Sequence, residues 1–254
     1  MSERSVLIVG ACGGIGRATA LQQAGLGTRL LLTDLHSDGL RTLAKDCGDA
    51  GASHVSVLAA DVAQPEHAER AVAMAVDNAD RIDGLVYAAG ITGPVAPLGQ
   101  YPGNAFEDVL KVNLVGAFHI LTAALPALRR ADEAPVVLVG STSSIRGRSL
   151  LAGYVASKHA LLGLVRTACL ECADTGVRVN AVLPGPVDTP MLDELNRAAT
   201  SVAGDPDVAF GRSSPQSGLA TPGDIAHTIS YLLSPAARHV RGAAWVVDGG
   251  GSVG

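Results

Sequence analysis

The segment SVLIVGACGGIGRATA, residues 5–20, combines the features that decide the fold. Its apolar run at 5–9 is typical of a buried strand, and the residues from Arg17 onward indicate a helix. Between them lies a glycine-rich stretch, residues 10–16. Glycines at such a junction let a pyrophosphate approach the free N–H groups of a helix N-terminus. Turns also collect glycine, so the position between strand and helix carries this interpretation.

The rest of the chain repeats the alternation of short apolar runs and longer helical patterns, which predicts a parallel sheet covered on both faces. We expect strands at 5–9, 29–33, 55–59, 84–88, 136–140, 178–183 and 244–247, and helices at 16–24, 38–47, 65–78, 105–128, 154–174 and 222–233. The fold class is therefore α/β, a doubly wound Rossmann-type arrangement with a seven-stranded parallel sheet flanked by helices. Because no repeat or linker divides the sequence, we expect a single domain over residues 1–254.

Composition and charge exclude several classes of protein. Hydrophobic residues make up 48% and charged residues 17% of the sequence, which favours a packed core over disorder. A net charge of -5 leaves no basic surplus for a nucleic-acid backbone. The sequence shows no signal-peptide pattern and no apolar run near the ~18 residues of a membrane span, so we expect a cytoplasmic protein.

Two further features have weaker implications. Cys169 and Cys172 have the spacing of a metal-binding pair, but they lie in a predicted helix and no second pair follows, so we expect reduced thiols and no metal. The segment 186–220 shows no clean strand or long helix, and a loop of that length is usually functional, such as a lid.

Asp34 ends the second expected strand, 18 residues beyond Gly16. At that distance a carboxylate accepts hydrogen bonds from the ribose 2′-OH of a dinucleotide and repels a 2′-phosphate. Neither Gly13 nor the residues directly after Asp34 supply a basic group, so the pattern favours NAD(H) over NADP(H). The alternative is that Asp34 only caps a turn.

The segment Tyr154-Val155-Ala156-Ser157-Lys158 resembles the Y-x-x-x-K motif of the short-chain dehydrogenase/reductase family, and the resemblance extends over essentially the whole chain. Residues at i and i+4 share one helix face, so the ammonium of Lys158 can lie near the phenol of Tyr154. Its charge would then lower the pKa of the phenol from the usual ~10.

The same resemblance implies two further catalytic residues. Ser141 precedes Tyr154 by 13 residues and matches the family's serine, which holds the substrate oxygen. Ser143 and Ser144 are close enough to leave the register open. Asn113 resembles the family's helix-bending asparagine, which holds a water that connects Lys158 to solvent, although a purely structural hydrogen bond is the alternative.

The resemblance also implies cofactor contacts along the chain. They are Gly10, Gly14, Ile15 and Gly16 for the pyrophosphate, Asp61 and Val62 near the adenine, and Pro184, Gly185, Val187 and Thr189 near the nicotinamide. Residues 247–250, VDGG, are similar to the family's closing strand and turn, and the family pattern implies a homotetramer.

The sequence departs from the family pattern at two places. Val9 precedes Gly10 where the family commonly has Thr, and residues 87–90, YAAG, replace the usual Asn-Asn-Ala-Gly. These changes remove polar groups that stabilise the sheet or touch the cofactor ribose. Ala88 and Gly90 keep their backbone atoms as possible cofactor contacts.

Together these residues predict an NAD-dependent oxidoreductase that moves a hydride to or from the carbon of a secondary alcohol or ketone, with Tyr154 as acid and base. A catalytically silent NAD(H)-binding regulator would be expected to have lost a member of this tetrad, and an extended-family epimerase would be expected to carry a C-terminal substrate domain. We expect the pocket walls from 94–101, 145–151 and 191–217, where Leu150, Leu151, Met191, Leu192 and Leu195 suggest an apolar pocket. The sequence leaves the substrate open.

Overall fold

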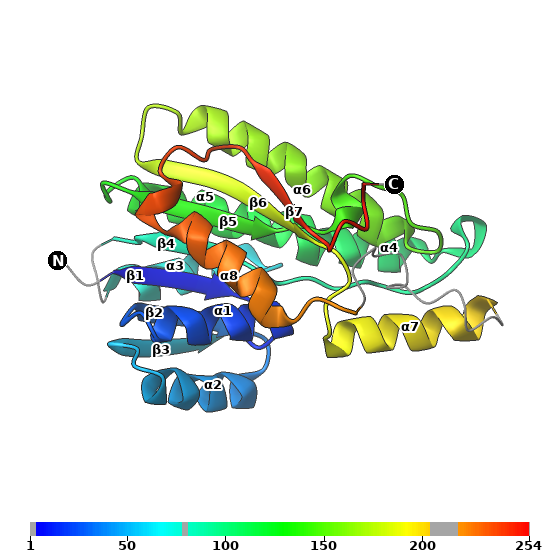
Figure 1. The fold of residues 1–254 in the computed structure, drawn as a ribbon, viewed down its shortest axis with the longest axis horizontal. Helices are drawn as coiled ribbons and strands as arrows, with labels where there is room; N and C mark the ends of the chain where they lie inside the picture. The colour runs from blue at the N-terminus through cyan, green and yellow to red at the C-terminus, as the bar shows by residue number, and fades with distance from the viewer. Residues whose placement is uncertain (1–3, 78–80, 204–217, 254) are drawn as a thin grey trace.

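The computed structural model describes residues 4–77, 81–203 and 218–253. Seven strands form one parallel sheet in the order β3-β2-β1-β4-β5-β6-β7 (Figure 1). The strands are β1 (Ser5–Val9), β2 (Arg29–Asp34), β3 (His54–Ala59), β4 (Gly84–Tyr87), β5 (Ala134–Val139), β6 (Val177–Pro184) and β7 (Ala244–Val247). The predicted seven-stranded parallel sheet is confirmed, and each predicted strand end lies within two residues of the observed one.

Helices cover both faces of this sheet. They are α1 (Gly14–Ala24), α2 (Ser37–Asp49), α3 (Pro65–Asp77), α4 (Gly103–Leu110), α5 (Gly116–Leu128), α6 (Ala152–Glu171), α7 (Pro190–Ala203) and α8 (Pro222–Leu233). One core cluster joins α3, α5 and α6 to the sheet, and a second joins α1, α2 and α8 to its other face. Because both faces are covered, every residue of β1, β4, β5 and β6 is buried.

The helix predicted at 105–128 is interrupted. Between α4 and α5 the chain forms a π-helical turn, Lys111–Val115, with the fully buried Asn113 at its centre. Such turns occur frequently at functional sites, and an asparagine inside an apolar helix marks this one. In the described part of the chain, Gly103–Leu128 is the one helix long and apolar enough to cross a membrane by length and composition (mean hydropathy 1.5). Many of its apolar side chains belong to the core cluster with α3 and α6, which accounts for this composition.

The expectation of an irregular segment at 186–220 is wrong for its first half, because α7 occupies Pro190–Ala203. Pro190 stands at the first helical position, where its missing N–H costs nothing. Leu192 and Ala199 are buried and Leu195 is half-buried, as expected of an amphipathic helix with one packed face. Residues 204–217, which complete the predicted lid, lie outside the described residues, as does Asn78 at the predicted end of α3.

The order of the strands places a crevice at the middle of the sheet. From β1 the chain first builds outward through β2 to β3, and it then returns to β4 on the other side of β1. In open sheets of this kind the connections at the carboxyl ends of the two central strands diverge, and ligands bind in the gap between them.

Candidate active site

A cleft of about 510 Å³ opens at the carboxyl ends of the strands. It is lined by the glycine-rich loop after β1, by the segments that follow β2 to β6, and by the start of α7. Every predicted cofactor and catalytic residue except Asn113 lies on its wall: Gly10, Gly14, Ile15, Gly16, Asp34, Asp61, Val62, Ala88, Gly90, Ser141, Tyr154, Lys158, Pro184, Gly185, Val187 and Thr189. Residues from seven separate stretches of the chain are therefore brought to one cavity.

The glycine-rich loop is tightly folded against its surroundings. Gly10 has φ +76°, and a Cβ atom there would lie 2.4 Å from the backbone nitrogen of Ala89. A Cβ atom at Gly16 would lie 2.1 Å from the carbonyl oxygen of Gly10. Only glycine fits at these two positions, because the loop must turn sharply and pass close to its own backbone.

The N-terminus of α1 fits an anionic group. Its N-cap residue, Gly13, provides no side-chain hydrogen bond, and the first turn contains no acidic residue. The first N–H groups of a helix have no acceptor within the helix, and the helix dipole favours negative charge beside them. The cleft wall at Gly14, Ile15 and Gly16 therefore suits the pyrophosphate of a dinucleotide.

Asp34 lies at the end of β2, beside the glycine-rich loop. Its carboxylate accepts hydrogen bonds from the backbone N–H groups of Cys12, at 2.9 Å, and His36, at 3.3 Å. Asp34 therefore caps the turn and also lines the cleft. Each of its carboxylate oxygens retains a second lone pair that can accept a ligand hydroxyl.

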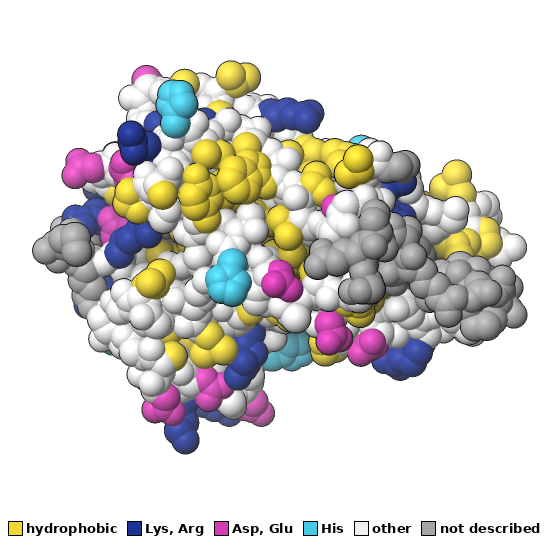
Figure 2. Space-filling view, viewed as in Figure 1, with side chains coloured by type: hydrophobic (Ala, Val, Ile, Leu, Met, Phe, Trp, Pro, Cys, Tyr) yellow, Lys and Arg dark blue, Asp and Glu magenta, His cyan; other side chains and the backbone are white. Residues whose placement is uncertain are grey.

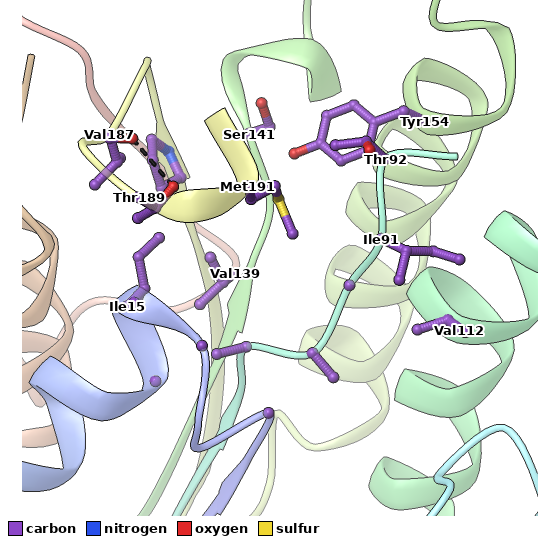
Figure 3. Close-up of a pocket in the computed structure, with 18 of the residues that line it drawn as sticks. Ile15, Ile91, Thr92, Val112, Val139, Ser141, Tyr154, Val187, Thr189 and Met191 are labelled. Atoms are coloured by element: carbon purple, nitrogen blue, oxygen red, sulfur yellow. Dashed lines mark hydrogen bonds between the residues drawn. The ribbon is translucent and has the colours of Figure 1, made fainter. Parts of the chain in front are cut away.

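Two hydroxyl side chains meet at the other end of the cleft. The hydroxyl of Tyr154 is directed toward Ser141 (Figure 3). Ser141 is the N-cap of a short 3₁₀ turn, and its Oγ accepts the N–H of Ser143 at 3.1 Å while its own N–H donates to Ser144 Oγ at 3.2 Å. This capping box fixes the serine side chain and favours Ser141 over its two neighbours as the partner of Tyr154.

Lys158 lies one helical turn after Tyr154 on α6. Its Nζ atom is 5.6 Å from the centre of the Tyr154 ring and donates a hydrogen bond to the carbonyl oxygen of Val139 at 2.9 Å. Burial lowers the pKa of Lys158 to about 8, because the ammonium loses its hydration. The predicted side-by-side arrangement of phenol and amine is present.

The predicted direction of the Tyr154 shift is wrong for the protein without ligands. Burial raises the pKa of Tyr154, and the nearby hydroxyl of Ser141 opposes this effect only in part. Desolvation disfavours the phenolate more strongly than the neighbouring groups favour it. The sequence spacing indicates which groups meet, whereas the net shift depends on how completely the fold buries them.

Asn113 lies behind the cleft wall. Its Oδ1 accepts the N–H of Ile91 at 2.8 Å, and its Nδ2 donates to the carbonyl oxygen of Ile91 at 2.9 Å and to Ser157 Oγ at 3.0 Å. A Cβ atom at Gly90 would lie 3.2 Å from Asn113 Oδ1 and 3.5 Å from Lys158 Nζ. The side chain therefore ties the segment after β4 to α6, directly beside Lys158.

Thr189 closes the cleft opposite the glycine-rich loop. Its hydroxyl donates to the carbonyl oxygen of Val187 at 3.2 Å (Figure 3), and a Cβ atom at Gly14 would lie 2.6 Å from its methyl carbon. The segment after β6 therefore approaches the segment after β1 closely. The four cysteines are free thiols, and the described residues contain no group of three or more His, Cys, Asp or Glu side chains that could hold a metal ion.

Sequence reasoning missed part of the wall around Tyr154. Ile91 and Thr92 line the cleft although no expected wall segment included them, whereas Arg148 and Leu151 lie in the expected segment 145–151. Residues 94–101 were expected in the wall, but they line no part of the cleft, and Val95 packs behind Leu151 instead. Met191, Leu192 and Leu195, at the start of α7, line the cleft as expected, whereas Leu150 does not.

Known proteins resemble this chain over nearly its full length. A family model described as enoyl-(acyl carrier protein) reductase matches residues 10–252. Levodione reductase of Leifsonia aquatica is 33% identical over 99% of this chain and 95% of its own, and cyclohexanol dehydrogenase of an Acinetobacter species is 30% identical over 98% and 94%.

Solved structures agree with this result. The crystal structure of levodione reductase superimposes with a TM-score of 0.93 at 32% identity, covering 98% of both chains. NAD⁺-bound xylitol dehydrogenase has a TM-score of 0.92 at 28% identity, covering 96% of this chain and 97% of its own. An actinorhodin polyketide ketoreductase variant with NADPH has a TM-score of 0.91 at 31% identity, covering 98% and 97%.

These matches cover the cleft and the Tyr154–Lys158 helix together with the whole sheet. The chain belongs to the short-chain dehydrogenase/reductase family, and it is an oxidoreductase.

Proposed function

We propose that the protein transfers a hydride between NAD(H) and the carbon of a secondary alcohol or ketone. The observation that carries this proposal is that the hydroxyl of Tyr154 faces Ser141 in the same cleft as the uncapped N-terminus of α1. A nicotinamide cofactor, when bound, supplies the hydride acceptor or donor. The chain's own residues then have to hold the cofactor, orient the substrate oxygen and move one proton.

In the oxidative direction, Tyr154 Oη accepts the proton of the substrate hydroxyl while Ser141 Oγ holds the same oxygen. Lys158 stabilises the phenolate through its charge, 5.6 Å from the ring centre. Because both polar atoms of the Asn113 amide already bond Ile91 and Ser157, we assign Asn113 a positioning role, and any part in a water relay falls to its backbone. In the reductive direction Tyr154 donates the proton.

We propose NAD(H) as the cofactor, because Asp34 lies where a 2′-phosphate would have to bind. The N–H groups of Cys12 and His36 hold its carboxylate in place, so the negative charge cannot easily turn away. The related structures include one with NAD⁺ and one with NADPH, so they do not distinguish the two cofactors. The preference for NAD(H) therefore rests on the negative charge of Asp34. The pyrophosphate would rest on Gly14, Ile15 and Gly16, and the nicotinamide amide beside Val187 and Thr189.

We propose an alicyclic alcohol or ketone as the substrate body. Ile91, Leu151, Met191, Leu192 and Leu195 surround Tyr154 with apolar surface that a hydrocarbon ring would cover. The names of two relatives support this choice, since one is called cyclohexanol dehydrogenase and the other levodione reductase.

The test of the proposed function is Tyr154→Phe. With cyclohexanone and NADH, followed by absorbance at the NADH wavelength, this variant should lose about 10²- to 10⁴-fold in turnover while NADH binding, measured by fluorescence titration, stays unchanged. His159→Gln is the matched control, because its imidazole bonds Val155 on the same helix and lies outside the cleft wall. Turnover by Tyr154→Phe equal to that of the wild type would refute the proposed chemistry.

We further propose that the chain folds as one domain and assembles as a homotetramer in the cytoplasm. Figure 2 shows apolar side chains gathered over α8 and β7. The β7–α8 face consists of Tyr231, Trp245 and Val246, which are 40%, 37% and 40% exposed. A tetramer needs a second interface, and Phe118, 51% exposed on α5, lies on the other layer of helices. Four free thiols are consistent with a reducing compartment.

A further inference from the structure

The charged residues on the cleft wall are unevenly distributed. Asp34 and Asp61 follow β2 and β3, on the side assigned above to the ribose and adenine. Two cations, Arg148 and Lys158, lie on the chain that runs from β5 through α6, which also carries Ser141 and Tyr154. The half of the cleft that holds the reacting groups is therefore positively charged.

These two cations differ in their bonding. Lys158 is 4% exposed and its Nζ bonds the carbonyl oxygen of Val139 beneath Tyr154. Arg148 is half-buried, and in the described part of the chain its guanidinium forms neither an ion pair nor a side-chain hydrogen bond. A guanidinium offers five N–H donors, and withdrawing them from water without a partner is unfavourable.

Arg146, two residues earlier, shows what a structural arginine does in this segment. Its Nη1 donates to the carbonyl oxygen of Gly251 at 2.5 Å and so attaches the segment to the C-terminal part of the chain. Arg146 does not line the cleft, whereas Arg148 does. Only the second of these two arginines is in a position to meet a ligand.

The backbone around Arg148 is held at both ends. The N–H of Arg146 donates to the carbonyl oxygen of Thr142 at 3.1 Å, and the carbonyl oxygen of Leu150 accepts the N–H of Ala96 at 3.0 Å. Leu150 has φ 68°, a left-handed conformation that is unfavourable for leucine and that clusters at functional sites. The segment therefore presents Arg148 from a fixed base, which is what a specific ion pair requires.

Apart from Ser141 and Thr92, the wall around Tyr154 is largely apolar. Ile91, Leu151, Met191 and Leu195 provide hydrocarbon surface without charge. A ligand that matches this half of the cleft has an apolar body and one anionic group. Guanidinium groups bind carboxylates through two parallel charge-assisted hydrogen bonds, which fix orientation as well as supplying energy.

We propose that Arg148 binds a carboxylate of the substrate, so that the preferred substrates are hydroxy acids and their oxo-acid products with an apolar ring between the two polar groups. This inference rests on the proposed function and adds the substrate class to it. The carboxylate takes no part in the reaction: the carbinol C–H hydride goes to NAD⁺, and the hydroxyl proton goes to Tyr154. Arg148 is thus a specificity-determining residue that orients the carbinol carbon.

The experiment compares 4-oxocyclohexanecarboxylate with its methyl ester, which has the same ring and ketone but no charge. With saturating NADH, the wild type should favour the acid by about 10- to 100-fold in kcat/KM, the range expected of hydrogen bonds to a charged group. Arg148→Met should lose this preference through a raised KM for the acid while leaving the ester and the KM for NADH unchanged. Arg148→Lys should recover part of the preference.

Arg146→Met is the matched control, because it removes the same charge from the same segment outside the cleft. It should keep the wild-type ratio between acid and ester. A wild type without preference for the acid, turnover of neither compound, or a changed KM for NADH in Arg148→Met would overturn the assignment of Arg148. Turnover of cyclohexanone in the same assay would show that the proposed function holds even where this inference fails.

Discussion

Asp34 combines a structural and an electrostatic role in one carboxylate. Its hydrogen bonds to the N–H groups of Cys12 and His36 fix the glycine-rich loop against β2, and its charge faces the cleft. Asparagine at this position would keep one of the two hydrogen bonds, because its amide has a single acceptor oxygen, and it would remove the repulsion of a 2′-phosphate.

We therefore expect Asp34→Asn to narrow the preference for NAD⁺ over NADP⁺ by about tenfold or more, mainly by lowering the KM for NADP⁺. The measurement is the ratio of kcat/KM for the two cofactors with one alcohol substrate. Asp38→Asn removes the same charge from α2, outside the cleft, and should leave the ratio unchanged. A wild type that already prefers NADP⁺ would refute the assignment to Asp34.

Lys158 is held at a cost to stability, because its ammonium is buried. Its folded-state pKa of about 8 lies below the ordinary value of 10.5. Below pH 8 both folded and unfolded chains keep the proton, so the full desolvation penalty is present. Between pH 8 and 10.5 only the unfolded chain keeps it, so this penalty disappears as pH rises.

Lys158→Met removes this titration. We expect the free energy of unfolding of the variant, minus that of the wild type, to be largest near pH 7. This difference should fall by up to ~3 kcal/mol as the pH rises to 10.5. Chemical denaturation of both proteins at several pH values measures the difference, in which the other titrating groups cancel. The lost hydrogen bond to Val139 adds only an offset that does not depend on pH. A difference that stays constant across this range would show that Lys158 has an ordinary pKa in the folded protein.

The loop between β1 and α1 works as one rigid unit, because its glycines pack against backbone atoms. Ala at position 16 would place Cβ 2.1 Å from the carbonyl oxygen of Gly10, so α1 would have to move away from the loop. At Gly13 the nearest atom to a new Cβ would be 3.5 Å away, which is ordinary contact.

Gly16→Ala should therefore raise the dissociation constant for NADH at least tenfold and lower the melting temperature by several degrees, since a forced backbone shift costs about 1–3 kcal/mol. Gly13→Ala, in the same loop, should retain NADH binding within about threefold. Fluorescence titration and thermal unfolding report the two effects. Equal NADH affinity for the two variants would contradict the close packing of the loop.

Elements with strong periodicity were predictable from the sequence, and interrupted ones were not. The apolar run of β1 indicates its burial, and the capping box of Thr221 and Asp224 marks the start of α8. The π-helical turn at Asn113 depends on its hydrogen bonds to Ile91 and Ser157, which come from other segments. The position of a polar residue can be predicted from the sequence, but the partners that hold it cannot.

In the whole molecule, too, one half of the cleft was predictable from the sequence and part of the other half was not. In the half that meets the proposed cofactor, Gly10 and Asp34 could be placed from the spacing of the glycine-rich loop and the second strand, and Thr189 from the family resemblance. The half around Tyr154 also takes Ile91 and Thr92 from the segment after β4, which no sequence pattern marked as part of the wall. Their meeting depends on the paths of loops across the end of the sheet, which no local propensity determines.

The outer edge of the sheet provides the last test, because among the described residues β7 pairs with β6 alone. Trp245 lies on this strand, stacked on Tyr231 with ring centres 5.4 Å apart.

We expect the wild type to elute near four times its mass of 25.7 kDa in size-exclusion chromatography with light scattering. Trp245→Glu should yield smaller assemblies with an unchanged circular dichroism spectrum, because a buried charge at an interface costs several kcal/mol. Leu26→Glu, at an isolated residue that is 69% exposed, should leave the mass unchanged. A monomeric wild type, or a Trp245→Glu variant of wild-type mass, would rule out assembly through the β7–α8 face.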